Sequence, residues 1–269
     1  MISALRRYSR LEERAVTMSV LFWLTDAQMA RLEPFFPKSH GKPRVDDRRV
    51  LSGIIFINRN GLRWRDAPSA YGPHKTRYNR WKWWSDKGVF ARMMAGLASE
   101  HGEQKTIMID ATYLKAHCTA TSLGVKNSGR GRLIGRTKGG MNTKRHAICD
   151  SHGRPLYFFV TAGQVSDYIG ARALLSSLPD VDWLLGERGY DADWLREALK
   201  DKGIRACVPG RKQRKKAVKY DKRRYKRRNR IEIMFGRLKD WRRVATRYDR
   251  CPKVFLSAIA LAALVIYWL

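Results

Sequence analysis

Apolar residues recur at helical spacing in the first hundred residues of the chain. The stretch LTDAQMARLEPFF offers Thr25 or Asp26 as an N-cap, and a proline ends it. The next stretch, residues 45–61, closes at Gly61 after five apolar positions that share one stripe: Val50, Leu51, Ile54, Ile55 and Ile57. Both stretches predict short amphipathic helices.

A third helix is predicted over residues 74–88, after a Gly-Pro turn. Tyr78, Trp81 and Trp84 recur there at three-residue steps. Four basic residues supply the remaining surface: Lys75, Arg77, Arg80 and Lys82. Three short helices with a basic last one are typical of a helix-turn-helix protein whose final helix enters a DNA groove. The alternative for Trp81 and Trp84 is packing in the core, and the bases between them are expected to contact phosphates rather than to read sequence.

Beyond this helical region, short apolar strands alternate with helices. KTIMIDATYLKAH predicts a strand that ends at Asp110, and HAICD and PLYFFVTAG predict two strands across the turn at residues 151–154. A helix at residues 167–178, the strand VDWLLGE, a helix from Asp191 to Lys202 and the strand IRACV follow. Residues 124–140, rich in Gly and Arg, predict an exposed loop. Strands joined by helical crossovers predict an α/β domain with a mixed sheet.

The chain is strongly basic, with 55 Lys and Arg residues against 24 Asp and Glu residues and a formal net charge of +31. So large an excess of one sign destabilises a compact state unless a polyanion neutralises part of it. Residues 211–230 alone hold 13 basic residues and one acid, Asp221, which favours contact with a phosphate backbone. We therefore expect a nucleic acid partner. The alternative is a folded basic protein without a specific partner.

The cysteines and the two ends of the chain argue against several classes of protein. The four cysteines contain no C-x-x-C pair, which argues against a zinc ribbon or a disulfide framework and fits a reduced, cytoplasmic setting. The apolar stretch Val254–Leu269 is shorter than the ~18 residues of a membrane span, so it predicts a buried helix and no membrane partner. The first residues lack the order of a signal peptide. Residues 1–17 are expected to be an upstream extension, because Met18 offers a second start.

A polar stripe marks the helix predicted for YKRRNRIEIMFGRLKDWRRV. At about 100° per residue, Tyr225, Arg228, Glu232 and Lys239 fall within about 60° of one another. A different face carries three apolar residues that can dock on the sheet: Ile231, Met234 and Leu238. An isolated glutamate among bases would indicate charge compensation, but the neighbours of Glu232 on the stripe favour a functional role.

Three acids lie where the chemistry of cutting and joining DNA would need them. Two Mg²⁺ ions about 3.5–4 Å apart polarise phosphodiester oxygens and activate a water or a 3′-hydroxyl when acids from different elements hold them. The chain offers Asp110 after TIMI, Glu187 after WLLG and Glu232 on the basic helix. Three other acids are expected to have structural roles. Asp191 is expected to be an N-cap, Asp150 a turn residue and Asp167 a helix cap.

These residues carry a resemblance to a known family. The motifs IDAT at Asp110 and LLGERGYD at Glu187, with the spacing Tyr225-x2-Arg228-x3-Glu232-x6-Lys239, resemble the IS5 family of insertion-sequence transposases. The resemblance runs from WLTDAQ to IYWL, and LRWRDAP and YGPHKTRYNRW are similar to the helical DNA-binding region of that family. It implies a transposase with an RNase H-like DDE catalytic domain, preceded by an all-α, helix-turn-helix-like domain.

The resemblance also implies roles for single residues. Asp110 and Glu232 would be the first and third metal-binding acids, and the position of the second falls on Glu187, where the family has aspartate. Three signature residues around the third acid would contact DNA: Tyr225, Arg228 and Lys239. The implied cofactor is Mg²⁺, which Mn²⁺ can replace. The implied partners are the inverted-repeat ends of the element and target DNA, bound by a homodimer or a larger assembly on the bacterial nucleoid.

Composition shifts along the chain predict its domains. The basic block is expected to be an insertion in the catalytic domain, at residues 209–230. The expected regions are an amino-terminal extension, a helical DNA-binding domain, the catalytic domain and a carboxyl-terminal apolar helix: residues 1–23, 24–101, 105–250 and 251–269.

Glu187, where the family has aspartate, allows alternatives to an active transposase. Its side chain is one methylene longer than that of aspartate, and a displacement of about 1 Å can cost on the order of 10²-fold in rate. Two alternatives to an active transposase follow. One is a catalytically impaired protein that binds ends or represses its own element, and the other is a metal-dependent nuclease without strand transfer.

Overall fold

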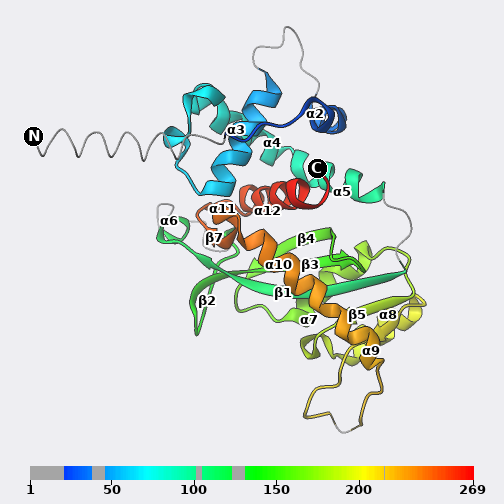
Figure 1. Cartoon of the computed structure of the whole chain (residues 1–269). Coiled ribbons are helices and arrows are strands. Elements are labelled where there is room, and N and C mark those ends of the chain that lie inside the picture. Colours follow the sequence, from blue (N-terminus) through cyan, green and yellow to red (C-terminus); the bar gives the residue numbers. More distant parts are fainter. Residues whose placement is uncertain (1–20, 38–45, 101–104, 123–130, 215) are drawn as a thin grey trace, which may run out of the picture.

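A mixed β-sheet forms the centre of the molecule, with strand order β2-β3-β1-β5-β6, while β4 pairs with β3 and β7 pairs with β1 (Figure 1). β1 is antiparallel to β3 and parallel to β5, and β5 is parallel to β6, so the predicted mixed sheet is confirmed. The strands are β1 (Thr106–Ala116), β2 (Gly135–Thr137), β3 (Gly140–Asp150), β4 (Pro155–Ala162), β5 (Trp183–Gly186), β6 (Arg205–Cys207) and β7 (Thr246–Arg247).

The structure is a computed structural model, and it describes residues 21–37, 46–100, 105–122, 131–214 and 216–269. The expected extension at residues 1–17 and the second start at Met18 lie outside these ranges. So do the expected boundary between the two domains and part of the Gly- and Arg-rich loop. The end of that loop is not irregular as expected, because β2 pairs there with β3.

Helices cover both faces of the sheet, and alternation along β1 explains which side chains each face receives. Met108 and Leu114 belong to the same core as the long helices α10 (Asn229–Lys239) and α12 (Pro252–Tyr267). Ile107 and Ile109 point the other way, into a second core with α7 (Asp167–Leu174) and α8 (Asp193–Asp201). Three short α-helices and a 3₁₀ turn also border the sheet: α6 (Cys118–Thr121), α9 (Lys222–Tyr225), α11 (Arg242–Ala245) and Arg188–Tyr190.

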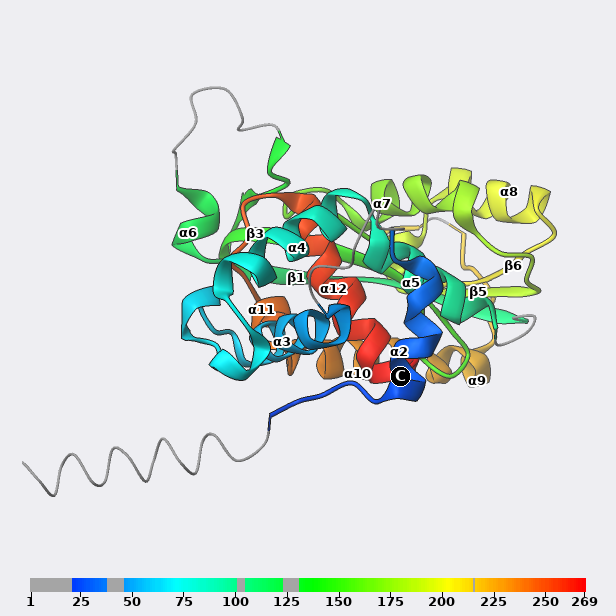
Figure 2. The same ribbon diagram turned by 90° about the horizontal axis from the view of Figure 1, so that it is seen from above.

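The amino-terminal helices pack on the side of the sheet that carries α12 (Figure 2). They are α2 (Asp26–Leu32), α3 (Asp47–Asn60), α4 (His74–Asp86) and α5 (Val89–Ser99). Thr25 and Gln28 form a capping box at the start of α2, and Gly61 ends α3 in the left-handed region at φ 71°. The apolar stripe predicted for α3 is buried, as expected. The sequence pattern did not predict α5.

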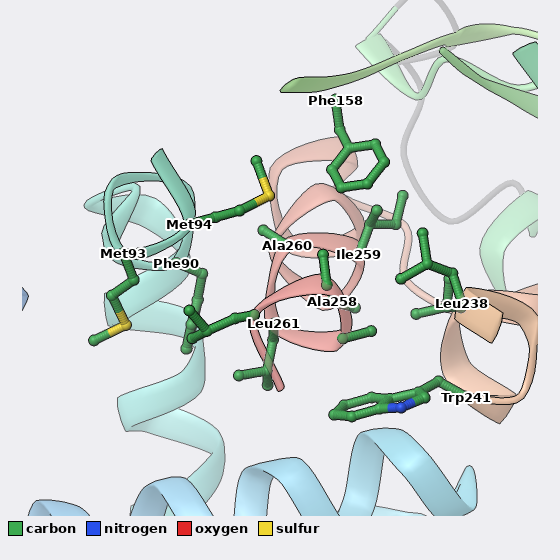
Figure 3. Packing of buried hydrophobic residues seen from close by; sticks show 14 of the residues in the cluster. Phe90, Met93, Met94, Phe158, Leu238, Trp241, Ala258, Ile259, Ala260 and Leu261 are labelled. Atoms are coloured by element: carbon green, nitrogen blue, oxygen red, sulfur yellow. The ribbon is translucent and has the colours of Figure 1, made fainter. Parts of the chain in front are cut away.

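The carboxyl-terminal helix α12 is buried, as predicted, and it joins the helical layer to the sheet. Ala258, Ile259, Ala260 and Leu261 are at most 2% exposed. Side chains from α5, β4, the end of α10 and the residue before α11 lie around them (Figure 3): Phe90, Met94, Phe158, Leu238 and Trp241. One continuous apolar core therefore extends from the amino-terminal helices to the sheet. No helix in the described part of the chain has the length and hydrophobicity needed to cross a membrane.

Candidate active site

Asp110 lies in the middle of β1, not at its end. The expectation that the strand stops there was wrong, because the backbone continues to pair with β3 as far as Lys115. Asp110 shares the sheet face of Met108 and Leu114, and it is 7% exposed. Its Oδ1 accepts a hydrogen bond of 2.7 Å from the backbone N–H of Ala111. The sheet and this hydrogen bond therefore fix the carboxylate in a position with little access to solvent.

Glu187 follows β5 directly, as the sequence predicts. The parallel register pairs Ile109 with Gly186, so the next residues along each strand, Asp110 and Glu187, lie side by side. The backbone C=O of Glu187 accepts a hydrogen bond of 2.9 Å from the N–H of Tyr190, which starts a 3₁₀ turn. The Glu187 side chain is 46% exposed, so it can reorient toward a ligand.

Glu232 comes from α10, which crosses the sheet face that carries Asp110 (Figure 1). Ile231, Met234 and Leu238 are fully buried beneath the helix, so the predicted docking face is confirmed. Docking of that face leaves Glu232 outside the core, where its side chain is 53% exposed. The path into α10 is less regular than predicted, because a 3₁₀ turn at Lys226–Arg228 separates it from α9.

The structure brings the three acids together. Asp110, Glu187 and Glu232 each offer a carboxylate oxygen, and these atoms lie within 4.8 Å of one another. Arg228 contacts all three, with guanidinium nitrogens 3.0 Å from Asp110 Oδ2, 2.9 Å from Glu187 Oε1 and 2.5 Å from Glu232 Oε1. One cation therefore compensates three anions that would otherwise repel one another at this distance.

The electrostatics of the cluster show how strongly its charges interact. Burial, followed by the negative charge of Glu187, raises the pKa of Asp110 to about 7, although the Ala111 N–H and Arg228 act in the opposite direction. Burial by itself would lower the pKa of Arg228, but Asp110, Glu187 and Glu232 outweigh it and hold that pKa above its ordinary value. The guanidinium is therefore firmly charged beside the three acids.

The donor set fits a divalent cation. Mg²⁺ prefers carboxylate oxygens at about 2.0–2.1 Å and completes its shell with water and substrate oxygens, so opposite ligands lie roughly 4 Å apart. At most one pair among three ligands can be opposite, and adjacent ligands lie roughly 3 Å apart, so three carboxylate oxygens within 4.8 Å of one another need to approach by up to about 2 Å to share one ion. Glu187 and Glu232 are half-exposed and have that freedom. Asp110, Glu187 and Glu232 are thus suited to hold such an ion together, provided that Arg228 withdraws.

Two groups near the acids were not predicted from the sequence. Asp167, expected to cap a helix, begins α7 without capping it and pairs with the buried Lys144 at 2.9 Å. The buried hydroxyl of Tyr190 has no hydrogen-bond partner in the described part of the chain. Burial raises the pKa of Tyr190, and the charges of Asp110, Asp167 and Glu187 raise it further. The clue in the sequence was the position of Tyr190, three residues after Glu187.

The other two residues of the predicted stripe lie on either side of Arg228 and Glu232 along α9 and α10. Lys239, two turns after Glu232, donates a hydrogen bond of 3.2 Å from Nζ to Thr112 Oγ1 on β1. Burial, followed by the positive charge of Arg145, lowers the pKa of Lys239. Tyr225 stacks under the Arg228 guanidinium at 5.7 Å from its ring centroid. The stripe therefore lies along one edge of α9 and α10.

The basic residues predicted on α4 do not form one surface. Arg77 was wrongly assigned to the surface: it is 1% exposed and donates hydrogen bonds to backbone C=O groups of the preceding turns: Pro68, Trp64 and Ala67. Arg80 pairs with Asp47 at 2.9 Å, while Lys75 and Lys82 are exposed. Trp81 and Trp84 are at most 1% exposed, which confirms the core alternative for both.

The structural roles predicted for two other acids have different outcomes. Asp150 is a turn residue, as expected, and its Oδ1 accepts hydrogen bonds of 2.8 Å from the N–H groups of His152 and Arg154. Asp191 does not cap α8, whose N-cap is Ala192. Its buried carboxylate instead accepts hydrogen bonds from three arginines of the following segments: Arg196, Arg211 and Arg214. Neither acid belongs to the cluster.

Two sequence profiles and two relatives that match this chain are all described as transposases. The sequence profile described as "Putative transposase of IS4/5 family" matches residues 24–94, and that described as "Transposase DDE domain" matches residues 184–269. The "Putative transposase for insertion sequence element IS6501" of Brucella ovis is 35% identical over 128 residues, which are 47% of this chain and 98% of that protein. The protein with the same description for element IS402 of Burkholderia cepacia is 26% identical over 156 residues, 51% of this chain and 72% of that protein.

A solved structure also resembles the chain. The piggyBac transposase, in a synaptic complex with hairpin DNA, aligns with 91% of this chain and 72% of its own, with a TM-score of 0.50 and 8% sequence identity. At that identity the likeness concerns the fold alone.

Proposed function

This chain belongs to the IS4/5 family of insertion-sequence transposases and has the RNase H-like DDE fold, and on that premise we propose that Asp110, Glu187 and Glu232 are its catalytic acids. The enzyme would cut the ends of its element and join the freed 3′-hydroxyls to target DNA. One observation carries the assignment: acids from β1, the tip of β5 and α10 present oxygens within 4.8 Å of one another.

Each residue of the site has a distinct task in this proposal. Asp110, held by the sheet and by the Ala111 N–H, would supply the fixed ligand, and the half-exposed Glu187 and Glu232 would complete the set of carboxylate ligands. Mg²⁺ bound there, or Mn²⁺ in its place, would polarise the phosphodiester and lower the pKa of an attacking water. Arg228 would leave the acids and pair with the DNA phosphate, and Lys239 and Tyr225 would hold the strand beside it.

DNA is the proposed partner because the chain carries a net charge of +31. The piggyBac complex contains DNA in a synaptic assembly, and we extend that kind of partner to this chain as its inverted-repeat ends and target DNA. Residues 24–101 would contribute the DNA-binding region, with Lys75, Arg80 and Lys82 on phosphates. Joining both ends needs two active sites, which favours a homodimer or a larger assembly.

The proposal is tested with DNA that carries the element ends, in Mg²⁺ or Mn²⁺, by counting nicked and joined products. Asp110→Asn and Glu232→Gln should abolish both products, and Glu187→Gln should do the same. Glu187→Asp should lower the rate by up to about 10²-fold, because the shorter arm withdraws its oxygen by about 1 Å. The matched control is Glu197→Gln, an exposed acid of α8 on the opposite face of the sheet.

Three results would redirect the proposal. Wild-type protein that binds ends without cutting them, beside a Glu187→Asp variant that cuts well, would indicate an impaired end-binding protein. Nicks without joined products would indicate a nuclease. Acid variants that cut as fast as Glu197→Gln would show that the site lies elsewhere.

A further inference from the structure

Gly236 lies on the same edge of α10 as the proposed catalytic acid. It follows Glu232 by four residues and precedes Lys239 by three, so at about 100° per residue the three positions fall within about 60° of one another. Gly236 is exposed. It therefore fills the gap in the polar stripe between the acid cluster and Lys239.

The protein alone gives no reason for a glycine at this position. Glycine inside a helix is less stable than any ordinary residue except proline, because its backbone loses the most freedom. Gly236 does not have a positive φ, and outside its own turns of helix a Cβ built there would meet no atom of the described residues within 4 Å. By contrast, a Cβ on Gly170 would lie 2.2 Å from His146 Cε1, and a Cβ on Gly53 would lie 2.7 Å from Tyr71 Cβ. Those two glycines are explained by packing, and Gly236 is not.

The surroundings of Gly236 fit a strand of DNA. Lys239 has no carboxylate partner in the described part of the chain, and its Nζ donates a hydrogen bond to the hydroxyl of Thr112. From Glu232 to Lys239 the helix rises by about 10 Å, and three nucleotides of one DNA strand span about the same length. A strand whose reacting phosphate lies at the acids would thus carry another phosphate to Lys239, and it would cross α10 at Gly236.

We infer that Gly236 is a positioning residue: its missing side chain lets the DNA strand lie directly against α10 between the acid cluster and Lys239. This inference rests on the proposed function of the same site. A methyl group at position 236 would hold the strand away from the helix by about 1 Å or more, and misplacement on that scale costs on the order of 10²-fold in rate.

The test compares Gly236→Ala and Gly236→Leu with Ile233→Ala as the matched control. Ile233 is 55% exposed on the same helix, and it lies about 100° around the helix from Glu232. Both alanine variants should raise the melting temperature, by roughly 2–4 °C for Gly236→Ala, because alanine is the better helix former. Cleavage of end-bearing DNA should fall at least about 10-fold for Gly236→Ala and further for Gly236→Leu. Binding of Mn²⁺ to the free protein should stay unchanged, and Ile233→Ala should cleave within about 2-fold of wild type.

Failure of this inference can be told apart from failure of the proposed function. Gly236→Ala protein that is more stable and cleaves as fast as wild type overturns the inference and leaves the catalytic acids in place. If the wild-type protein binds ends without cutting them, the inference about Gly236 is tested by measuring the affinity of each variant for the same DNA in Ca²⁺. Weaker binding by Gly236→Ala than by Ile233→Ala then supports the inference, and equal binding overturns it.

Discussion

Arg228 is the residue on which the acid cluster depends in the structure. Its guanidinium contacts Asp110, Glu187 and Glu232 and occupies the space that a bound ion would need. Asp110 is the most buried of the three acids, and burial raises its pKa to about 7. Arg228 therefore compensates the carboxylates of the free protein and is expected to compete with a divalent ion for them.

We expect Arg228→Gln to destabilise the metal-free protein by on the order of 2 kcal/mol, because one buried and two half-exposed carboxylates lose their common cation. Mn²⁺ should restore this loss, so that the ion raises the melting temperature of the variant more than that of wild type. Thermal unfolding with and without Mn²⁺ measures both effects. Arg227→Gln, an exposed neighbour in the same turn, is the control. Equal stability and equal Mn²⁺ shifts in the two variants would refute the competition.

At the scale of elements, periodic patterns predicted most of the fold. The apolar stripe of α3 and the docking face of α10 were both readable, because burial of one face imposes helical spacing on the sequence. The grouping of Asp110, Glu187 and Glu232 was predicted from the chemistry of DNA cleavage and from a family resemblance. Their separation of less than 5 Å could not be read from the sequence, since it depends on strand register and on how α10 crosses the sheet.

Other features depend on contacts between segments distant in sequence. Arg77 is buried because backbone C=O groups of a nearby turn accept its hydrogen bonds, and a basic residue carries no signal of that arrangement. β2 and β7 have only 3 and 2 residues, too few for an alternating pattern. β1 extends past Asp110 because β3 supplies hydrogen-bond partners, although polar residues interrupt its apolar run.

The contact between β3 and β4 at His146 makes the stability of the protein depend on pH. His146 is fully buried, stacks on Phe159 at 4.4 Å between ring centroids and has its Nε2 2.9 Å from Thr161 Oγ1. Burial lowers the pKa of His146 to about 4; Lys144 lowers it as well, while Asp167 opposes the shift. The unfolded chain, with an ordinary pKa near 6.5, takes up this proton first as the pH falls.

The contribution of His146 should be fully present above about pH 6.5 and should be lost as the pH falls toward about 4, by about 3 kcal/mol in total. We expect His146→Phe to have a smaller decrease in the free energy of unfolding over this range than wild type, measured by urea denaturation at several pH values. His152→Phe is the control, because its side chain is 67% exposed. Parallel pH profiles for wild type and His146→Phe would contradict this assignment.

For the whole molecule, one apolar core links the amino-terminal helices to the catalytic sheet through α12 (Figure 3). The net charge of +31 counts the whole chain, and many of the basic residues lie on this single framework, so a DNA partner can contact several of its elements at once. The basic block is not uniform, however. The Arg214 guanidinium binds the buried Asp191, while Arg211 reaches that acid only through its backbone N–H and is itself exposed, as are Lys219 and Lys222. Only the exposed bases are available for phosphate.

Affinity for DNA should fall steeply with salt, and Lys219→Gln with Lys222→Gln should reduce the slope of log K against log salt by up to about 1.8, or about 0.9 for each phosphate that these lysines neutralise. The same two-charge change on α8, Lys200→Gln with Lys202→Gln, should leave the slope unchanged, because these exposed residues lie on the other face of the sheet. Titration of a labelled end-bearing duplex at several salt concentrations measures the slope. A double variant on the basic block with the wild-type slope would mean that these bases only face solvent.

The central claim is that Asp110, Glu187 and Glu232 together hold a divalent ion for DNA cleavage. Anomalous scattering from crystals of the protein with end-bearing DNA and Mn²⁺ tests it most directly. We predict a Mn²⁺ peak roughly 2 Å from oxygens of these carboxylates, with the Arg228 guanidinium withdrawn from them. A Mn²⁺ peak at another place on the protein, or Arg228 still bridging the three acids in the DNA complex, would contradict the claim.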